Sequence, residues 1–405
     1  MDSLITAAGR SLAAGDPLGA LALVALRQDA AALALRGTAM AQLGDLARAR
    51  ELLRGAARAF GLSEPIARAR CHVAEAEIAL VLRDIGAPMD RLADARATLA
   101  ARGDRANAAH AGYLMARRLL LIGRLGEAQA ILEGMEVSAL PTASRAGAWL
   151  VAAGIATRRI ETEPARAALD KAATAAEAAG IAAVTAEVVQ AVRAFEAPAA
   201  RLLHQGNTRL VALPEVEAVM GSDALVIDAL RGIVRAGAVV VPLSGRPVLF
   251  ALVLALAEAW PNDVSRETLL IRAFRARHAD ESHRARLRVE IGRLRFAISE
   301  LADIRATENG FILRPRAKSM VVLSPPQEDD HGDVLALLAD GEAWSSSALA
   351  LALDVSPRTV QRALDALAAA GKVESFGRGR ACRWTARQLI GFPTVLLLPA
   401  PLPAG

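Results

Sequence analysis

The stretch ESHRARLRVEIGRLRFAIS, residues 281–299, combines an apolar helical stripe with a high density of arginine. Leu287, Ile291, Leu294 and Ile298 recur at intervals of three and four residues, which is the spacing of one face of an α-helix. This spacing predicts a helix whose apolar stripe packs into a core. We expect the arginines on its surface, with Arg284, Arg288 and Arg295 opposite the stripe and Arg286 and Arg293 on the flank.

The sequence on either side of this stretch predicts a small α+β domain. Short β-type runs at 225–232 and 238–245 are followed by a helical pattern over 246–260, which Pro261 interrupts. The next helix begins near Val264, with Ser265 as its expected N-cap. Beyond residue 299, two strand-like runs flank Asn309-Gly310, a pair that is typical of a hairpin turn. The predicted order is therefore a sheet, three helices and a hairpin.

Residues 224–315 resemble the DNA-binding domain of OmpR/PhoB-type response regulators, a winged helix-turn-helix that we place at 222–316. The resemblance is carried by VSRETLL (264–270), VEIGRLR (289–295) and ATENGFIL (306–313). It implies that 281–299 is the recognition helix and that the hairpin is the wing. The implied DNA contacts are Arg284, Arg286, Arg288, Gly292, Arg293 and Arg295 on the helix, with Arg305 and Asn309 on the wing. Gly292 departs from the polar or basic residue usual there, and no phosphoacceptor receiver domain precedes the domain, so phosphorylation control is not implied.

A second helical pair follows in LALDVSPRTVQRALDALAAAGKV, residues 351–373. We expect helices at 328–338, 346–353 and 357–370, with Ser356 as the N-cap of the third and Val360, Leu364 and Leu367 packed inward. A strand, a glycine-rich basic tip and a returning strand follow in VESFGRGRACRW (373–384). Residues 328–388 resemble bacterial winged helices of the GntR and DeoR type. The DNA contacts expected here are Ser356, Arg358, Thr359, Gln361 and Arg362 on the helix, with Arg378 and Arg380 at the tip.

Residues 1–204 contain a recurring unit in which a helix ends at a small-residue turn and an alanine-rich helix follows. The segments 43–49 and 122–128, LGDLARA and IGRLGEA, can be aligned at this turn. The pattern resembles tetratricopeptide repeats, in which paired helices stack on their neighbours. A plain alanine-rich helical bundle is the alternative. Either arrangement offers a surface for a protein or peptide partner, for an effector, or for a homo-oligomer.

Composition and charge narrow the function further. The 405 residues are 54% hydrophobic but only 3% aromatic, which favours a mainly α protein with closely packed helices. The net charge is +5, with 24 basic against 21 acidic residues over 1–204, 17 against 13 over 205–323 and 7 against 9 over 324–405. The two cysteines are far apart in the sequence and no two histidines have the spacing of metal ligands. The sequence therefore indicates neither a disulfide framework nor a metal site, and we expect no cofactor. The N-terminus and the longest apolar run predict a cytoplasmic protein without a membrane segment.

Two further segments were assigned from composition. Residues 316–330 contain Pro325-Pro326 and three consecutive acids, and we expect an irregular linker between the two winged helices. Residues 389–405 form an apolar tail punctuated by proline, whose role the sequence leaves open.

The sequence predicts a non-enzymatic, bacterial-type transcriptional regulator that reads double-stranded DNA through two winged helices. No nucleotide-binding loop, nucleophile elbow or zinc-protease motif is present, so a catalytic function is not expected. Two readings stay open against this one. The arginines of 284–295 could be only a solvated helix face, and the chain could be a scaffold whose repeats and winged helices dock partner proteins. Activation or repression, the target operon and the effector are not predicted.

Overall fold

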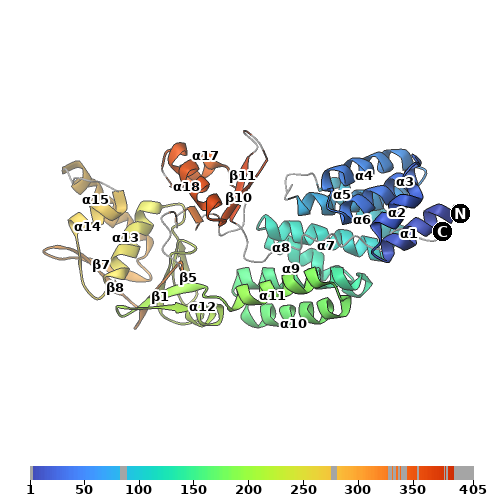
Figure 1. The fold of residues 1–405 in the computed structure, drawn as a ribbon. Helices are drawn as coiled ribbons and strands as arrows, with labels where there is room; N and C mark the ends of the chain where they lie inside the picture. The colour runs from blue at the N-terminus through green and yellow to red at the C-terminus, as the bar shows by residue number, and fades with distance from the viewer. Residues whose placement is uncertain are drawn as a thin grey trace. The chain divides into compact units, whose positions relative to one another are not determined.

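The computed structural model describes residues 3–82, 89–274, 281–326, 344–353 and 355–377, together with 331, 334, 335, 338, 379 and 382–386. The chain is mainly helical, with small sheets confined to its C-terminal half (Figure 1). It divides into two compact units, one built on residues 1–194 and the other on 195–375 with 383–387. None of the described helices combines the length and the apolar character needed to cross a bilayer.

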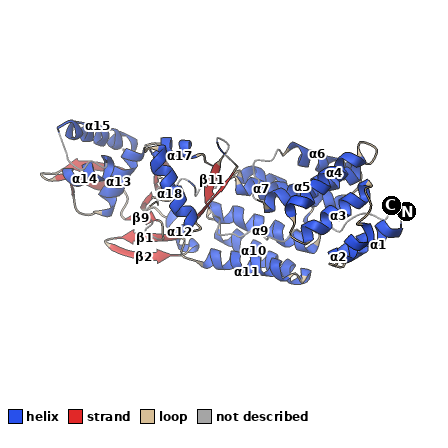
Figure 2. Ribbon diagram, turned by 45° about the horizontal axis from the view of Figure 1, so that its top comes forward, coloured by secondary structure: helices blue, strands red, loops and turns tan. Residues whose placement is uncertain are grey.

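The first unit is a succession of antiparallel helices, each packed against the next (Figure 2). Its core is made largely of alanine and leucine, and alanine allows the helix axes to approach closely. The helices are α1 (Ser3–Ala13), α2 (Pro17–Val24), α3 (Ala30–Gln42), α4 (Leu46–Phe60), α5 (Pro65–Val81), α6 (Asp90–Ala101), α7 (Arg105–Leu121), α8 (Leu125–Glu133), a 3₁₀ turn η1 (Val137–Ala139), α9 (Thr142–Arg159), α10 (Thr162–Ala179) and α11 (Ala182–Glu196).

One backbone turn recurs between these helices. After α3, the N–H of Asp45 donates to Met40 O at 3.0 Å and the N–H of Gly44 donates to Ala41 O at 3.1 Å. This pair of bonds closes the helix end and requires a left-handed residue, which Gly44 supplies with φ of +88°. The same two bonds occur around Gly15, Gly103, Gly123 and Ile160. Gly44 and Gly123, the two positions aligned in the sequence, therefore adopt the same turn.

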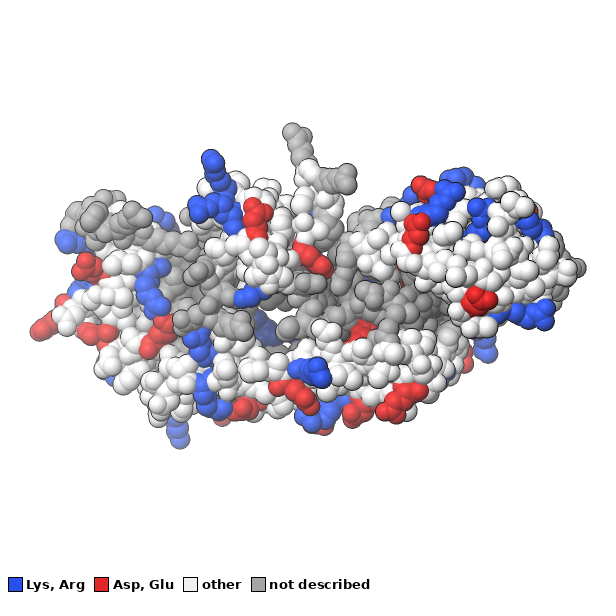
Figure 3. Space-filling model, viewed as in Figure 1, with Lys and Arg blue, Asp and Glu red and all other residues white. Residues whose placement is uncertain are grey.

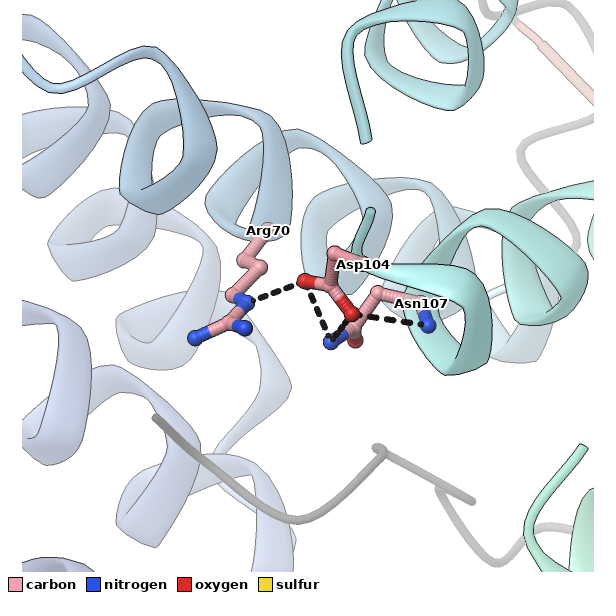
Figure 4. Close-up of polar contacts among 3 residues, drawn as sticks. All are labelled: Arg70, Asp104 and Asn107. Carbon is pink, nitrogen blue, oxygen red and sulfur yellow. Dashed lines mark hydrogen bonds and ion pairs between the residues drawn. The ribbon is translucent and has the colours of Figure 1, made fainter. Parts of the chain in front are cut away.

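In three of these turns the residue after glycine also begins the next helix. Asp16, Asp45 and Asp104 each accept a hydrogen bond from a backbone N–H in the first turn of the helix that follows. Asp104 has a second role, because its carboxylate also accepts from Arg70 Nε at 2.7 Å and from the Asn107 side chain at 3.0 Å (Figure 4). This aspartate both caps α7 and ties it to α5. The Gly-Asp pair is thus a sequence signal for the repeated connection.

The core of the first unit contains a buried polar chain. His110 on α7 lies between Glu77 on α5 and Ser144 on α9, with Nε2 to Oε2 at 3.0 Å and Nδ1 to Oγ at 3.1 Å. The three side chains are at most 2% exposed. A serine, a histidine and a carboxylate in series are the components of a hydrolase site, but no substrate could reach a serine that is fully buried. We interpret these hydrogen-bonded side chains as a structural link between α5, α7 and α9.

The second unit opens with a six-stranded sheet whose order is β2-β1-β9-β3-β4-β5. The strands β3, β4 and β5 form an antiparallel meander, while β9 inserts between β1 and β3, antiparallel to the former and parallel to the latter. The bounds are β1 (Ala200–His204), β2 (Asn207–Val211), β3 (Leu225–Asp228), β4 (Ile233–Ala236), β5 (Val239–Pro242) and β9 (Met320–Ser324), with helix α12 (Leu213–Met220) between β2 and β3.

The position of β9 corrects two predictions. Residues 316–330 were expected to be an irregular linker, yet Met320 to Leu323 are buried in the middle of this sheet. A short apolar run with β-branched residues, such as 320–323, is typical of a strand. The irregular linker was predicted instead because Pro325, Pro326 and three acids follow this run directly. The boundary expected at residue 204 also shifts, because β1 pairs with β9 and belongs to the second unit.

Three helices and a three-stranded sheet follow β5. The helices are α13 (Pro247–Glu258), α14 (Arg266–Phe274) and α15 (Glu281–Ala297), and the strands β6 (Val264–Ser265), β7 (Ala302–Ala306) and β8 (Gly310–Pro315) are ordered β6-β8-β7. The hairpin β7–β8 is antiparallel, and Ala306 pairs with Phe311 across it. One apolar core joins α13, α14 and α15 to both sheets. The predicted element order from 225 to 315 is therefore present, with β4 and β6 as additional strands.

The last described segment contains α17 (Ser346–Leu353), α18 (Pro357–Ala369), β10 (Val373–Phe376) and β11 (Arg383–Ala386). Trp344 pairs with Trp384 through two backbone hydrogen bonds of 2.8 and 2.7 Å, which adds a bridge to the edge of the β10–β11 hairpin. The expected helices at 346–353 and 357–370 are confirmed to within one residue. Most of the helix expected at 328–338, the residues Arg378 and Arg380, and the tail 389–405 lie outside the described residues.

Candidate nucleic-acid interface

The start of α14 and the tip of the β7–β8 hairpin are held together by one arginine. Ser265 Oγ accepts from the N–H of Thr268 at 3.1 Å, which confirms Ser265 as the N-cap. From the next position, the Arg266 guanidinium donates to Glu308 O at 2.7 Å and to Thr307 O at 3.0 Å. The same guanidinium lies over the Phe311 ring, 5.5 Å from its centroid. These contacts fix where the hairpin tip lies relative to α14.

The four residues of the predicted stripe on α15 are confirmed as core residues. Leu287, Ile291, Leu294 and Ile298 are no more than 2% exposed. Successive helix residues are rotated by about 100°, so the residue two places before each core residue points to the opposite side. Those four positions form the outermost stripe of α15, which we call the α15 ridge, and all are exposed: Ala285, Val289, Gly292 and Phe296.

The α15 ridge corrects the expected placement of the arginines. Arg284, Arg288 and Arg295 were placed opposite the core, but that face is apolar, with Val289 54% exposed and Phe296 86% exposed. Arg288 and Arg295 follow core residues by one position and so lie on one flank, whereas Arg286 and Arg293 precede core residues and lie on the other. The predicted placement was wrong because the outer face of a helix lies two positions before its buried stripe, and in α15 those positions carry no arginine.

The flanking arginines differ in how they are held. Arg286 stacks over Phe274, 4.8 Å from the ring centroid, and Arg293 Nη1 donates to Glu290 Oε1 at 2.9 Å. Arg295 Nε donates to the carbonyl of Ile304 at 2.7 Å, which ties the end of α15 to β7. Arg284 and Arg288 are exposed on the opposite flank from Arg286. Arg295 thus has a structural contact that the sequence did not indicate.

Gly292 occupies an unusual position for a glycine. It lies in the interior of a helix, where glycine is destabilising by roughly 0.5–1 kcal/mol relative to alanine. A Cβ added there would meet nothing within 4 Å, so no packing within the protein requires its absence. The cost is explained if a molecule outside the chain approaches the backbone of α15 at this point.

The hairpin tip presents a second exposed set. Arg305 is exposed and pairs with Asp303 at 3.2 Å, and this hydrogen bond lowers the pKa of Asp303. Asn309 is exposed, and its carbonyl accepts from the N–H of Arg266 at 3.2 Å. The Asn309-Gly310 pair suggested that Gly310 is needed for the hairpin turn, but the structure gives a different reason. A Cβ on Gly310 would lie 1.8 Å from Val264 O, so close pairing with β6 excludes any side chain.

Helix α18 has the same plan with a polar outer face. Ser356 Oγ accepts from the N–H of Thr359 at 3.1 Å and contacts its hydroxyl at 2.9 Å, which confirms the predicted N-cap. Val360, Leu364 and Leu367 are buried as expected, and so is Ala363. The positions two before the core carry Arg358, Gln361, Arg362 and Asp365, all exposed. Gln361 Nε2 donates to Asp365 Oδ1 at 2.9 Å, and within the described part of the chain the two arginines form no ion pair.

Charge elsewhere on the molecule is mixed. In the face drawn in Figure 3, basic and acidic side chains are interspersed over the helices of the first unit. Among the described residues no group of His, Cys, Asp and Glu is arranged to hold a metal ion, and neither Cys71 nor Cys382 forms a disulfide. The neighbourhood of α15, with five arginines and two glutamates between residues 281 and 299, is a local concentration of positive charge.

Comparison of the chain with protein-family models, with curated proteins and with solved structures finds no match to any of them. Function must therefore be argued from the site. Three residues that matter at this site were missed in the sequence: Arg266, which holds the hairpin tip, and Val289 and Phe296 on the α15 ridge. The ridge could have been found by shifting the core stripe by two positions. The role of Arg266 depends on contacts more than 40 residues away along the chain, which no local pattern encodes.

Proposed function

We propose that this chain is a DNA-binding transcriptional regulator of the winged-helix type, with α15 as its principal DNA-reading helix and the tetratricopeptide-like repeats as its effector or assembly region. The observation that carries the proposal is the α15 ridge with arginines on both of its flanks. A helix inserted in the major groove has the base edges ahead of it and a phosphate backbone on each side. On α15 the ridge would correspondingly face the base edges, and the arginines on its two flanks would face the two phosphate backbones.

Dimensions and chemistry support this arrangement. The major groove is about 12 Å wide, which admits a helix whose diameter with side chains is about 10–12 Å. Arginines on both flanks can then meet phosphates of both strands, which supplies affinity without sequence selectivity. An exposed phenylalanine and an exposed valine suit the C5-methyl group of thymine, the one apolar feature of the groove floor. Gly292 would let the helix backbone approach the bases.

The segment containing α17, α18 and the β10–β11 hairpin is proposed as a second DNA-binding module. Its outer face offers Arg358, Gln361 and Arg362, which are side chains suited to hydrogen bonding with guanine and adenine. Arg378 and Arg380, which lie outside the described residues, are proposed as further phosphate contacts of this segment. The two modules then differ in what they read, because α15 is apolar at its centre whereas α18 is polar.

Protein docking is the second candidate function, and the α15 ridge is also the observation that favours it. Exposed apolar side chains around a glycine suit close contact with another helix, and a scaffold would use them in that way. The arginines discriminate between the two. A protein partner needs them paired with carboxylates, whereas DNA makes binding fall steeply with salt, by a log–log slope of about −0.9 per phosphate contact.

The test is selection of bound duplexes from a random DNA pool by the full chain, followed by replacement of thymine with uracil in the selected sequence. Uracil lacks the C5-methyl group but pairs identically. We expect about a fourfold loss of affinity for each contacted methyl, from the transfer free energy of one buried carbon, and this loss should disappear in Phe296→Ala. Failure to select any sequence would leave docking as the better account.

A further inference from the structure

A cavity among the helices of the first unit has the chemistry of an anion-binding site. It lies between α4, α5 and α6 and has a volume of about 700 Å³, within the usual range of about 300–1,000 Å³ for small-molecule pockets. Four arginines and two carboxylates line it, so positive charge exceeds negative. These residues are Arg54, Arg58, Arg68, Arg91, Glu75 and Asp94.

The two acids do not neutralise the arginines evenly. Glu75 is committed to the side of α4, where Arg54 Nε lies 2.5 Å and Arg50 Nε 3.8 Å from Glu75 Oε1. Burial alone would raise the pKa of Glu75, but His72 and the two guanidinium groups outweigh it and lower this pKa to about 2. Glu75 is therefore ionised at physiological pH, and its negative charge is balanced by the guanidinium groups of Arg54 and Arg50.

The other three arginines have no such partner. The guanidinium groups of Arg58, Arg68 and Arg91 form no hydrogen bond or ion pair with any described residue. Several other arginines of the first unit are paired, as in Arg48 with Glu51 and Arg124 with Glu127. Three unpaired guanidinium groups on one cavity repel each other unless an anion lies between them.

The helix starts add to this field. Arg91 is the second residue of α6, and Arg68 lies one turn into α5, where a positive side chain opposes the positive end of the helix dipole. Neither helix receives a side-chain hydrogen bond at its N-cap. Arginines at these positions lower helix stability, and a bound anion would offset this repulsion because it attracts both the guanidinium groups and the helix starts.

We propose that this cavity binds a small molecule carrying at least two negative charges as phosphate or carboxylate groups. The planar guanidinium group suits both, because each offers two oxygens to its pair of N–H donors. Arg58, Arg68 and Arg91 hold the anion, while the exposed carboxylate of Asp94, which also lines the cavity, repels it. The site is independent of α15, and its position in the repeats is that of an effector site for the proposed regulator.

Calorimetric titration of the full chain with inorganic pyrophosphate and with citrate tests the proposal at constant ionic strength set by sodium chloride. We expect saturable binding of at least one probe with a dissociation constant below about 1 mM. Tighter pyrophosphate binding assigns a phosphate ligand, tighter citrate binding assigns a carboxylate, and equal binding supports the shared chemistry. No saturation by either probe up to about 10 mM would overturn the proposal.

Variants separate a site from general basic charge. Arg58→Gln and Arg68→Gln should each weaken binding by about tenfold or more, as expected for loss of a charged hydrogen bond. Arg102→Gln, an exposed arginine at the other end of α6, removes the same charge outside the cavity and should leave affinity unchanged. Asp94→Asn should tighten binding several-fold, a gain that misfolding would not produce. Equal weakening by Arg58→Gln and Arg102→Gln would contradict the site.

Discussion

Gly292 is the residue at which the fold and the proposed function make opposite demands on α15. An alanine there would remove the flexibility of glycine without meeting any neighbour, since the space beside it is open. Gly292→Ala should therefore raise the free energy of unfolding by about 0.5–1 kcal/mol. The same methyl group would keep a DNA duplex from the helix backbone, so affinity for DNA should fall.

Gly9→Ala is the matched control for this substitution. Gly9 also lies inside a helix, α1, with nothing within 4 Å of an added Cβ, so its substitution should stabilise by a similar amount without changing DNA affinity. Thermal unfolding and DNA titration of the two variants give both quantities. Equal DNA affinity of Gly292→Ala and the wild type would mean that nothing approaches the α15 backbone.

At the residue scale, the core of α15 was predictable whereas its surface was not. The stripe from Leu287 to Ile298 follows from spacing alone, because burial repeats with the helix period. The contacts of individual arginines depend on what the fold brings near them. Arg295 reaches a carbonyl on β7 and Arg286 reaches a ring on α14, and neither could be inferred from their own helix.

The helix connections of the first unit offer a test at the scale of an element. Gly44 closes α3 with φ of +88°, a conformation that costs an L-residue about 1–2 kcal/mol. Gly44→Ala should therefore lower the free energy of unfolding by about 1 kcal/mol, although no neighbour lies within 4 Å of the added methyl. Chemical denaturation measures this loss. A neutral or stabilising effect would show that the turn does not need its left-handed residue.

Strand β9 gives a second test at this scale. It supplies the central strand that joins β1 to β3, and its removal would separate the β1–β2 hairpin from the β3–β4–β5 meander and leave both with exposed edges. A fragment of residues 195–326 should therefore unfold cooperatively, whereas a fragment of 195–318, which lacks Met320 to Ser324, should not. Circular dichroism during thermal unfolding distinguishes the two. Cooperative unfolding of the shorter fragment would contradict the role of β9.

Elements were predictable where their signal is local. Ser265 and Ser356 cap their helices as expected, and the hairpin β7–β8 lies where its turn residues place it. Strand β9 was missed because its pairing partners are more than 90 residues earlier in the chain, so nothing adjacent marks it as central to a sheet. Because β9 occupies Met320–Ser324, the segment 316–330 is not an irregular linker over its whole length.

At the scale of the whole molecule, the division into two units predicts a division of functions. The first unit has only a small basic excess, with Lys/Arg and Asp/Glu interspersed on the face shown in Figure 3. A fragment of residues 1–194 should therefore leave a DNA duplex unshifted in an electrophoretic assay at about 0.15 M salt, where weak charge attraction is largely screened. A fragment beginning at residue 195, which retains β1, should shift it. DNA binding by the first fragment would reverse the assignment of functions.

The central claim is that α15 reads DNA with support from α18, and the most direct test is the affinity of the full chain for its selected duplex. Arg288→Ala and Arg362→Ala leave both buried stripes intact, so both variants should fold normally. Each should weaken binding by about fivefold to 100-fold, and loss of a phosphate contact should also reduce the salt slope by about 1. The double variant should bind more weakly than either single variant. Affinity and salt slope in the double variant equal to those of the wild type would contradict the account.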